Sequence, residues 1–469
     1  MEESKKTYGE QLAEELCYSP KHAGEVVSDE ELAKINTFCE DYKTFLDHAK
    51  IEREAVITSI ELAKERGYTE FVPGSHYQPG DKVYFNNRGK AVIFSTIGTK
   101  SLKEGVRIAA AHIDSPRLDL KPNPMYQDND LAYLKTHYYG GIRKYQWATL
   151  PLALHGVVIT RDGKTVTVNI GEDENDPVFC TTDLLPHLAA NQNKRTLGEG
   201  IQGEELNILI GSMPIKDDKA GEKVKLNILK ILHEKYGIVE SDFLSAELAA
   251  VPREKAKDLG FDRSMIGSYG HDDRVCAYAA LMAEFEAKNP EYTTVTVLTD
   301  KEEVGSDGNT GLNSSYMKYF IEMLAEAEEL PVHYVLSKSK CLSADVNAAF
   351  DPTFPDVSEK NNCSYLNKGV VITKYTGSRG KGGTSDASAE FMGEIRRMLD
   401  ENGVVWQIGE LGKVDMGGGG TVAKFIANLD VDVIDLGVPV LSMHAPFEVV
   451  AKTDVYMAYR AFACFYGNK

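Results

Sequence analysis

The chain has 469 residues, of which 71 are Asp or Glu and 52 are Lys or Arg, and its formal net charge is −19. This length suits two or three domains with large cores, and the acidic balance disfavours nucleic acid, whose phosphates are bound by clustered Lys and Arg. The apolar runs are far shorter than the roughly 20 residues that cross a bilayer, the N-terminus lacks the apolar core of a signal peptide, and the 7 cysteines show no paired spacing. We therefore expect a cytoplasmic protein with free thiols, without a membrane span.

The first part of the chain, residues 1–120, begins with amphipathic segments. The spacing of apolar residues predicts helices over 29–48 and 52–66, followed by strands over 91–95 and 106–111.

The last of these strands runs into His112-Ile113-Asp114-Ser115-Pro116. His112 and Asp114 are two residues apart, so in an extended chain their side chains lie on the same side. An Asp at this place can contact a metal-bound water or fix the neighbouring imidazole.

Residues 121–265 differ from the segments on either side. Residues 156–160 and 165–170 are rich in β-branched side chains and flank the turn Arg161-Asp-Gly-Lys164, which predicts a hairpin. None of the candidate metal ligands falls in this block, which predicts a separate β-rich domain inserted into the main one.

Helices and strands alternate again over residues 266–469, which predicts a mixed, mostly parallel sheet flanked by helices, an α/β fold. Three polar motifs lie here. Asp272 opens the helix-like stretch 275–288, Asp345 follows the apolar-rich segment 332–336, and His444 follows the strand-like segment 437–441. Ligands gather at the carboxyl ends of strands in α/β sheets, and this distribution of polar motifs after apolar runs fits that rule.

The most informative motif is Glu302-Glu303, directly after the apolar run 293–298. Adjacent side chains at a strand end point in different directions. One glutamate can therefore bind a metal while the other faces a substrate, which is the division that a hydrolytic metal site needs.

The candidate donors are two imidazoles and three carboxylates: His112, Asp272, Glu303, Asp345 and His444. A single zinc usually takes three protein ligands and a water, so five suit two metals about 3.5–4 Å apart that share a carboxylate. Zinc is the leading metal, and manganese or cobalt would also bind such donors.

These motifs in this order resemble the aspartyl aminopeptidase (aminopeptidase I) family of dinuclear zinc exopeptidases, over nearly the whole chain. The motifs are His112-Ile-Asp114-Ser-Pro, Asp272-Asp-Arg, Glu302-Glu303-Val-Gly-Ser, Ser-Ala-Asp345 and Ser-Met-His444. The resemblance implies a metalloaminopeptidase that acts on peptides, with a zinc exopeptidase-like catalytic domain and an inserted dimerisation domain over 121–265. It further implies a homo-oligomer, a dodecamer built from dimers.

The resemblance also implies a role for each residue. Asp272 would bridge the two metals, His112 and Asp345 would complete one site, Glu303 and His444 would complete the other, Glu302 would be the general base, and Asp114 would support it from behind His112. The choice of Asp272 over Asp273 follows the family pattern, in which the bridging Asp directly precedes an Asn or Asp.

Three positions depart from the family pattern. Asn347 stands where the family usually has His, the inserted domain reads Pro186-His187-Leu188-Ala189-Ala190-Asn191 rather than Pro-His-Leu-Ala-x-His, and the stretch after Lys374 lacks the usual Asn residues. By resemblance His187 could reach a neighbouring subunit's site, and Lys374 is the candidate to contact an acidic substrate side chain. These departures leave a preference for N-terminal Asp or Glu open.

Two other functions remain open at this point. Spacing alone does not separate an aminopeptidase from a deacylase or carboxypeptidase of the same clan, and a metal-bound scaffold without activity would show the same ligands. The glycine-rich stretches 377–384 and 416–421 lack the Gly-Lys-Ser/Thr ending of a nucleotide-binding loop. We expect them to be tight loops near the active site.

Overall fold

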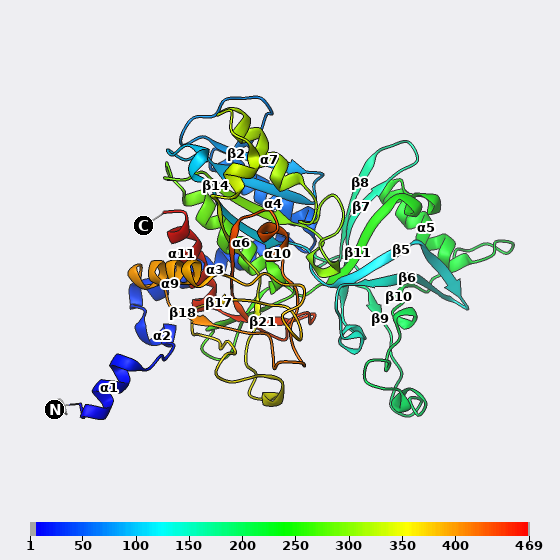
Figure 1. Ribbon diagram of the computed structural model, residues 1–469. Helices are drawn as coiled ribbons and strands as arrows, with labels where there is room; N and C mark the ends of the chain where they lie inside the picture. Colours follow the sequence, from blue (N-terminus) through cyan, green and yellow to red (C-terminus); the bar gives the residue numbers. More distant parts are fainter. Residues whose placement is uncertain (1–5, 468–469) are drawn as a thin grey trace.

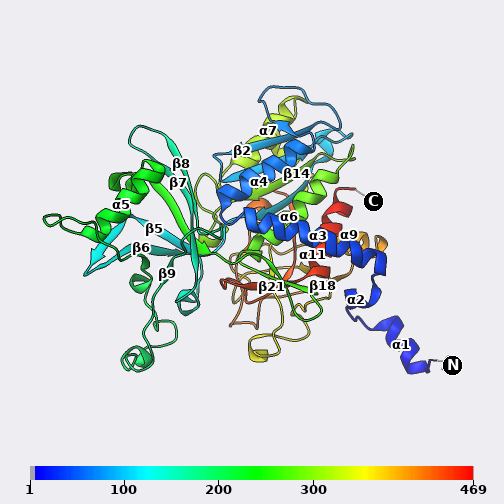
Figure 2. The same ribbon diagram turned by 180° about the vertical axis from the view of Figure 1, so that it is seen from behind.

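The computed structural model describes residues 6–467, and it shows a larger body beside a smaller β-rich lobe (Figure 1). The N-terminal helix α1 (Tyr8–Leu16) extends away from the body in both views (Figure 2), while α2 (Ala23–Val26) packs against the body, with Ala23 buried. No helix in residues 6–467 is long and apolar enough to cross a membrane. Every cysteine is free, and all of them lie within the described residues.

The body is built on a nine-stranded sheet with the strand order β1-β2-β3-β14-β4-β15-β19-β17-β18. Its strands are β1 (Thr69–Glu70), β2 (Lys82–Asn87), β3 (Ala91–Thr96), β4 (Arg107–His112), β14 (Thr294–Thr299), β15 (Lys340–Ser343), β17 (Val370–Thr373), β18 (Trp406–Ile408) and β19 (Asp432–Gly437). The four central strands, β14, β4, β15 and β19, are parallel, while β3 and β17 flank them in the antiparallel sense. The predicted mixed, mostly parallel sheet is confirmed.

Helices cover both faces of this sheet. In β4, Ile108 and Ala110 pack into one hydrophobic core and Ala109 and Ala111 into the other, because successive side chains alternate. One face is covered by α3 (Asp29–His48), α4 (Glu52–Glu65), α6 (His271–Glu286), α9 (Ala389–Glu401) and α11 (Lys452–Phe465), and the other by α7 (Tyr316–Glu326), α8 (Val332–Leu336) and α10 (Ala423–Ala427). Strands buried on both faces have continuous apolar sequences, which is why β3 and β4 could be predicted.

The smaller lobe contains a seven-stranded antiparallel sheet with the order β8-β7-β11-β5-β6-β10-β9. Its elements are β5 (Arg117–Asp128), β6 (Leu131–Tyr139), β7 (Leu152–Ile159), β8 (Thr165–Ile170), β9 (Cys180–Thr181), β10 (Ile208–Gly211), β11 (Ala246–Pro252) and the helix α5 (Lys223–Tyr236), which packs on β5, β6 and β10. The hairpin predicted around residues 161–164 is confirmed as β7 and β8.

A five-stranded sheet with the order β12-β13-β21-β20-β16 completes the body. Its strands are β12 (Lys257–Leu259), β13 (Met265–Ser268), β16 (Asn347–Ala348), β20 (Pro439–Leu441) and β21 (Glu448–Ala451). Asp272 comes shortly after β13, and His444 shortly after β20. The polar motifs therefore converge from two sheets, and not from the strand ends of one.

One local prediction is wrong, and the structure assigns a segment for which the sequence predicts no element. The apolar run 332–336 before Asp345 is helix α8, and the strand that precedes Asp345 is β15. The segment 437–441 is not one strand, because β19 ends at Gly437 and β20 begins at Pro439. A short apolar run fits a buried helix as well as a strand, so length and composition could not separate them.

A buried histidine joins the body to the smaller lobe. His155 of β7 is 1% exposed, with Nδ1 2.7 Å from Glu54 Oε1 in α4 and Nε2 3.1 Å from Glu172 Oε1 after β8. Burial lowers the pKa of His155, but the hydrogen bonds to Glu172 and Glu54 outweigh burial and raise it above its usual value, which is near 6.5. The imidazolium donates to both carboxylates, whereas the neutral ring can donate to only one.

We expect this contact to make stability fall with rising pH. A raised pKa in the folded state means that the contribution is complete below about pH 6.5 and is lost as the pH rises through the folded pKa. His155→Gln should remove about 1–3 kcal/mol at pH 6 and less at higher pH, measured by urea unfolding between pH 6 and 9. The exposed His76→Gln serves as the control. Parallel curves for the wild type and His155→Gln would contradict this role.

Candidate metal centre and active site

His112, the last residue of β4, has one imidazole nitrogen fixed and the other directed at carboxylates. Its Nδ1 lies 3.0 Å from the backbone oxygen of Asp114, so in the neutral ring Nδ1 carries the hydrogen and Nε2 the lone pair. Nε2 lies 3.1 Å from Asp272 Oδ1, 3.8 Å from Asp345 Oδ1 and 4.0 Å from Glu302 Oε2. A metal-binding nitrogen therefore faces carboxylates that come from three other segments.

His444 is arranged in the same way on the other side of Asp272. Its Nδ1 lies 2.9 Å from the backbone oxygen of Gly141, and its Nε2 lies 3.1 Å from Asp272 Oδ2 and 3.6 Å from Glu303 Oε2. The two oxygens of Asp272 thus face different imidazoles. The cluster has two halves that share Asp272: the His112 half, with Asp345, and the His444 half, with Glu303.

Oxygen atoms without donors show that the cluster fits cations. Asp272 Oδ1 and Glu303 Oε1 are buried with no hydrogen-bond partner, a state that is costly for a carboxylate unless a positive charge lies beside it. The ligand atoms of His112, Asp272 and Glu303 lie within 4.8 Å of one another. Imidazole and carboxylate donors without a thiolate suit zinc, manganese or cobalt.

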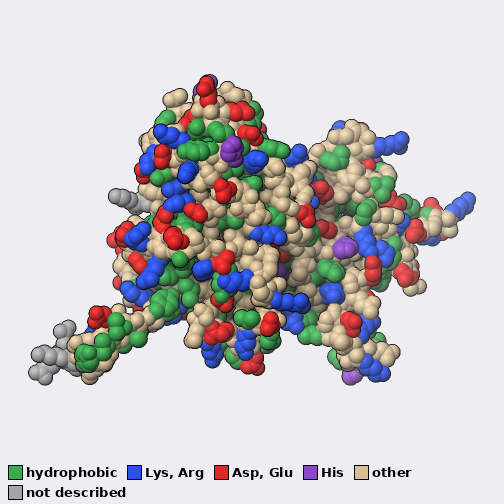
Figure 3. All heavy atoms as spheres, viewed as in Figure 1, with side chains coloured by type: hydrophobic (Ala, Val, Ile, Leu, Met, Phe, Trp, Pro, Cys, Tyr) green, Lys and Arg blue, Asp and Glu red, His purple; other side chains and the backbone are tan. Residues whose placement is uncertain are grey.

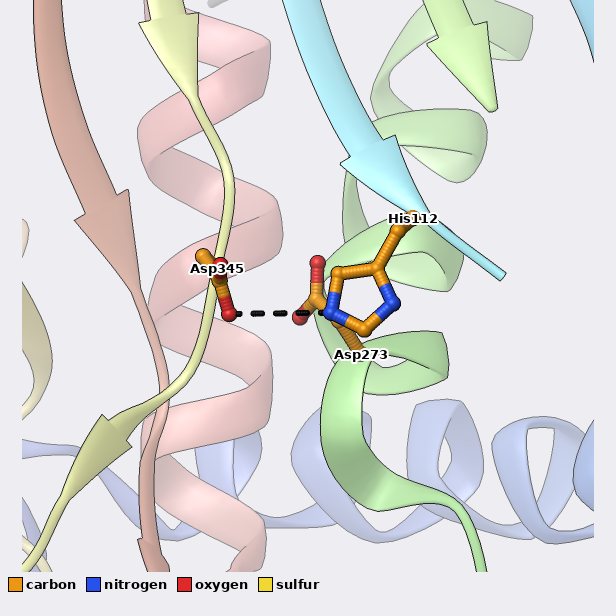
Figure 4. A group of neighbouring side chains, drawn as sticks. All are labelled: His112, Asp273 and Asp345. Atoms are coloured by element: carbon orange, nitrogen blue, oxygen red, sulfur yellow. Dashed lines mark ion pairs between the residues drawn. The ribbon is translucent and has the colours of Figure 1, made fainter. Parts of the chain in front are cut away.

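Asp273 also lies beside the His112 half. Figure 4 shows Asp273, at the start of α6, next to His112 and Asp345, and ligand atoms of these three side chains lie within 4.8 Å of one another. Burial, together with the charge of Asp345, raises the pKa of Asp273 well above its usual range. The contacts of 3.1 Å to both imidazoles, however, belong to Asp272.

The turn after β14 separates the two adjacent glutamates. Glu302 and Glu303 begin the short 3-10 helix η6 (Glu302–Val304), and their backbone N–H groups donate to Asp114 Oδ1 and Oδ2, each at 3.2 Å. The side chain of Glu303 is 2% exposed and that of Glu302 is 19% exposed. One glutamate is therefore enclosed beside His444, and the other is open to an incoming molecule.

The crowding of carboxylates shifts the proton equilibria of the site. Burial raises the pKa of Glu302 to about 8, with His112 lowering it and Asp345 raising it. Burial lowers the pKa of His444, but the hydrogen bond to Asp272 and the charge of Glu303 outweigh burial and raise it to about 10. The cluster therefore attracts positive charge, either as protons or as metal cations that replace them.

Comparison with known proteins identifies the family of the chain. Residues 45–466 match the family model described as aminopeptidase I zinc metalloprotease (M18). The chain belongs to the M18 family. It is therefore a metalloaminopeptidase, a hydrolase that acts on peptide bonds, and the resemblance found in the sequence is confirmed.

Individual relatives match along almost the whole chain. A probable M18 family aminopeptidase 1 from Clostridium acetobutylicum is 49% identical over 465 residues, which cover 97% of this chain and 100% of that protein. The crystal structure of an M18 aminopeptidase from Thermotoga maritima aligns with a TM-score of 0.92 at 42% identity and covers 96% of this chain and 99% of that chain. That of aminopeptidase I from Clostridium acetobutylicum has a TM-score of 0.91 at 48% identity, with coverage of 97% and 100%.

Glu448 is a residue of this M18 site that the sequence analysis missed. Its carboxylate accepts the backbone N–H of Asp272 at 3.0 Å and that of His444 at 2.7 Å, and it is buried. It therefore joins the two residues that face each other across the cluster. Its place four residues after His444 gives no signal, because the contact with Asp272 spans 176 residues and uses the backbone.

We expect Glu448→Gln to weaken metal binding about 10–100-fold. The amide nitrogen would place a donor against one of the two backbone N–H groups, leaving that group unpaired. The matched control is Asp454→Asn, because Asp454 is also buried and accepts two backbone N–H groups, from Asn367 and Gly369. Both variants should unfold more easily, and isothermal titration with zinc should show a loss only in Glu448→Gln. Equal zinc affinities would contradict the role.

The two candidate substrate-binding residues lie outside the cluster of contacts described above. Lys374, after β17, is paired with Asp386, which also binds Lys381 at 2.9 Å. His187 is exposed in the segment after β9. Asn347, at the position where the family has His, is buried and donates to Thr373 Oγ1 at 3.2 Å.

The two glycine-rich stretches pack against each other. The N–H of Gly377 donates to the backbone oxygen of Gly419 at 2.5 Å, and a Cβ on Gly418 would lie 1.9 Å from the oxygen of Gly377. Glycine is required at this crossing because the two backbones touch.

Proposed function

We propose that this M18 aminopeptidase holds two zinc ions that share Asp272. The observation that carries the proposal is that each oxygen of Asp272 lies 3.1 Å from the Nε2 atom of a different imidazole. His112 and Asp345 would hold one ion, and His444 and Glu303 the other. Cobalt or manganese would fit the same donors.

In this proposal Glu302 is the general base. Two bound zinc ions would polarise the scissile carbonyl, activate a water and stabilise the oxyanion. Glu302 would take a proton from the attacking water and return it to the leaving amine. Its greater exposure than Glu303, 19% against 2%, supports this division of roles. Asp114 would support it by holding His112 and the backbone of both glutamates.

We further propose that the substrate is a peptide with a free N-terminus and that N-terminal Asp or Glu is preferred. The cation proposed to meet that acidic side chain is Lys374. A substrate carboxylate would have to displace Asp386 from this lysine, so the preference depends on that exchange of partners. The variant Lys374→Met should then lower kcat/KM for acidic substrates and leave that for leucine unchanged.

A substrate panel tests the proposed function. Aminoacyl substrates of Asp, Glu, Leu, Ala and Lys, each with zinc, cobalt or manganese, should be cleaved fastest when the residue is acidic, and N-acetylation should block cleavage. Faster cleavage of the neutral residues would overturn the proposed specificity. Cleavage of acetylated substrates would point instead to a deacylase, and release of C-terminal residues to a carboxypeptidase.

We propose that the chain is a cytoplasmic homo-oligomer, a dodecamer built from dimers through the block 121–265. Several large apolar side chains on the smaller lobe are exposed, among them Leu184, Leu185, Leu188, Leu197 and Leu244. Yeast aminopeptidase 1, at 20% identity and a TM-score of 0.76, is a dodecamer. In such an assembly His187 would face a neighbouring subunit. A fully active monomer in light scattering at micromolar concentration would contradict this assembly.

Peptides are the proposed partners, and nucleic acid is not. Figure 3 shows Lys and Arg side chains interspersed with Asp and Glu over the visible face of the molecule. A phosphate backbone is bound by clustered positive charge, which the net charge of −19 also disfavours.

A further inference from the structure

Three consecutive residues of the smaller lobe reach the candidate active site. They are Tyr139, Gly140 and Gly141, where β6 ends, and each lies beside a different residue of the site. Tyr139 is the last residue of β6 in the seven-stranded sheet and the two glycines follow it directly, whereas the residues beside this segment belong to the body. The smaller lobe and the body therefore meet at the candidate active site.

Tyr139 contacts Asp114. Its hydroxyl donates to Asp114 Oδ2 at 2.8 Å, the same oxygen that accepts the backbone N–H of Glu303. The ring of Tyr139 lies under the guanidinium of Arg117, 4.1 Å from the ring centroid, and Arg117 is itself held by Glu52 at 2.8 Å. Arg117 therefore holds the ring of Tyr139 in place, and the hydroxyl of Tyr139 in turn orients the Asp114 carboxylate.

Gly141 and Gly140 lie against the His444 half. The backbone oxygen of Gly141 lies 2.9 Å from His444 Nδ1, which directs Nε2 of that imidazole toward Asp272. Gly140 has a positive φ of 74°. A Cβ at this position would lie 3.1 Å from Glu303 Oε2 and 3.3 Å from Glu303 Cβ. Only glycine combines this backbone conformation with this closeness to Glu303.

We propose that Tyr139, Gly140 and Gly141 are positioning residues for the metal site, and that the smaller lobe thereby sets the geometry of the His444 half. The inference rests on the proposed dinuclear function. It adds that the site is incomplete without the end of β6, although none of the proposed ligands lies in that sheet. It also predicts an unequal effect, because Gly140 lies beside Glu303 and Gly141 contacts His444, whereas among the described residues neither glycine is hydrogen-bonded to His112 or Asp345.

The test uses the full-length protein and compares each variant with a matched control. Gly140→Ala is paired with Gly163→Ala, because Gly163 also has a positive φ, of 83°, but its Cβ would meet nothing within 4 Å. Tyr139→Phe is paired with Tyr138→Phe on the same strand, where alternation directs the side chain to the opposite face. Zinc binding is measured by competition with a chelator, the ligand geometry by the absorption spectrum of the cobalt form, and folding by thermal unfolding.

The expected result is a selective loss of one ion. Gly140→Ala should bind its second zinc at least about 10-fold more weakly than the wild type, keep the first, and change the cobalt spectrum. Gly163→Ala should lose similar stability and keep both ions. Tyr139→Phe should lower kcat about 10-fold or more with a smaller change in KM, and Tyr138→Phe should match the wild type.

Two results would overturn the inference. One is wild-type zinc affinity and an unchanged cobalt spectrum in Gly140→Ala together with unchanged kcat in Tyr139→Phe. The other is an equal loss in Gly140→Ala and Gly163→Ala, which would assign the effect to backbone strain alone. The wild-type protein separates these outcomes from failure of the proposed function: if it binds fewer than two zinc ions, the dinuclear proposal itself is wrong.

Discussion

Replacing Glu302 with glutamine is expected to lower kcat by about 10²–10⁴-fold, the usual contribution of a general base. Glutamine has nearly the same shape as glutamate but does not accept a proton at neutral pH. Glu302 is the more exposed of the two adjacent glutamates, so the change should leave the fold and the enclosed Glu303 in place. Steady-state turnover of an unblocked aminoacyl substrate measures the loss, and zinc content should stay the same as in the wild type.

The neighbouring variant Glu303→Gln provides the contrast for this prediction. Glu303 Oε2 lies 3.6 Å from His444 Nε2, so its loss should show first as weaker binding of one zinc ion and only then as lower turnover. If Glu302→Gln loses zinc and Glu303→Gln does not, the roles proposed for the two residues are reversed.

The second large effect is expected from Asp272→Asn. Among the described residues, Asp272 is the carboxylate that lies 3.1 Å from both His112 Nε2 and His444 Nε2. The amide of asparagine would offer only one oxygen to the two ions. We expect zinc affinity to fall by more than about 100-fold, beyond the loss that residues behind the ligands usually cause, and turnover to fall with it.

Asp273→Asn is the matched control, because it changes the adjacent residue in the same way. Asp273 lies beside the His112 half without a contact of this kind to His444 among the described residues. We expect its zinc affinity to stay within about 10-fold of the wild type. A larger loss in Asp273→Asn than in Asp272→Asn, measured by the same titration, would assign the shared ligand to Asp273.

Several elements could be predicted from the sequence because local pattern and tertiary burial agree. The amphipathic stretch 29–48 is helix α3 with the same bounds, and the apolar run 106–111 differs from β4 by one residue at each end. The apolar run before Asp345 could not be assigned, because five residues fit a buried helix or a strand equally well. The strand that does precede Asp345, β15, contains Lys340 and is only four residues long.

The contacts that orient the proposed ligands could not be predicted from the sequence, for a different reason. Each of these contacts uses a backbone group on one side: the backbone oxygen of Gly141 contacts His444 across 303 residues, and the carboxylate of Glu448 accepts the backbone N–H of Asp272 across 176. Backbone groups are the same in every residue, so no residue pattern marks them. The side chains that carry the proposed chemistry had distinctive motifs, and the groups that orient them did not.

The most direct test of the account is to titrate the metal-free protein with zinc and to measure bound zinc and release of the N-terminal residue from an unblocked peptide. The account predicts two zinc ions per chain, with turnover that reaches its maximum only when the second ion binds. Full turnover with one ion bound, and no second binding event, would contradict the shared role of Asp272 and with it the dinuclear site.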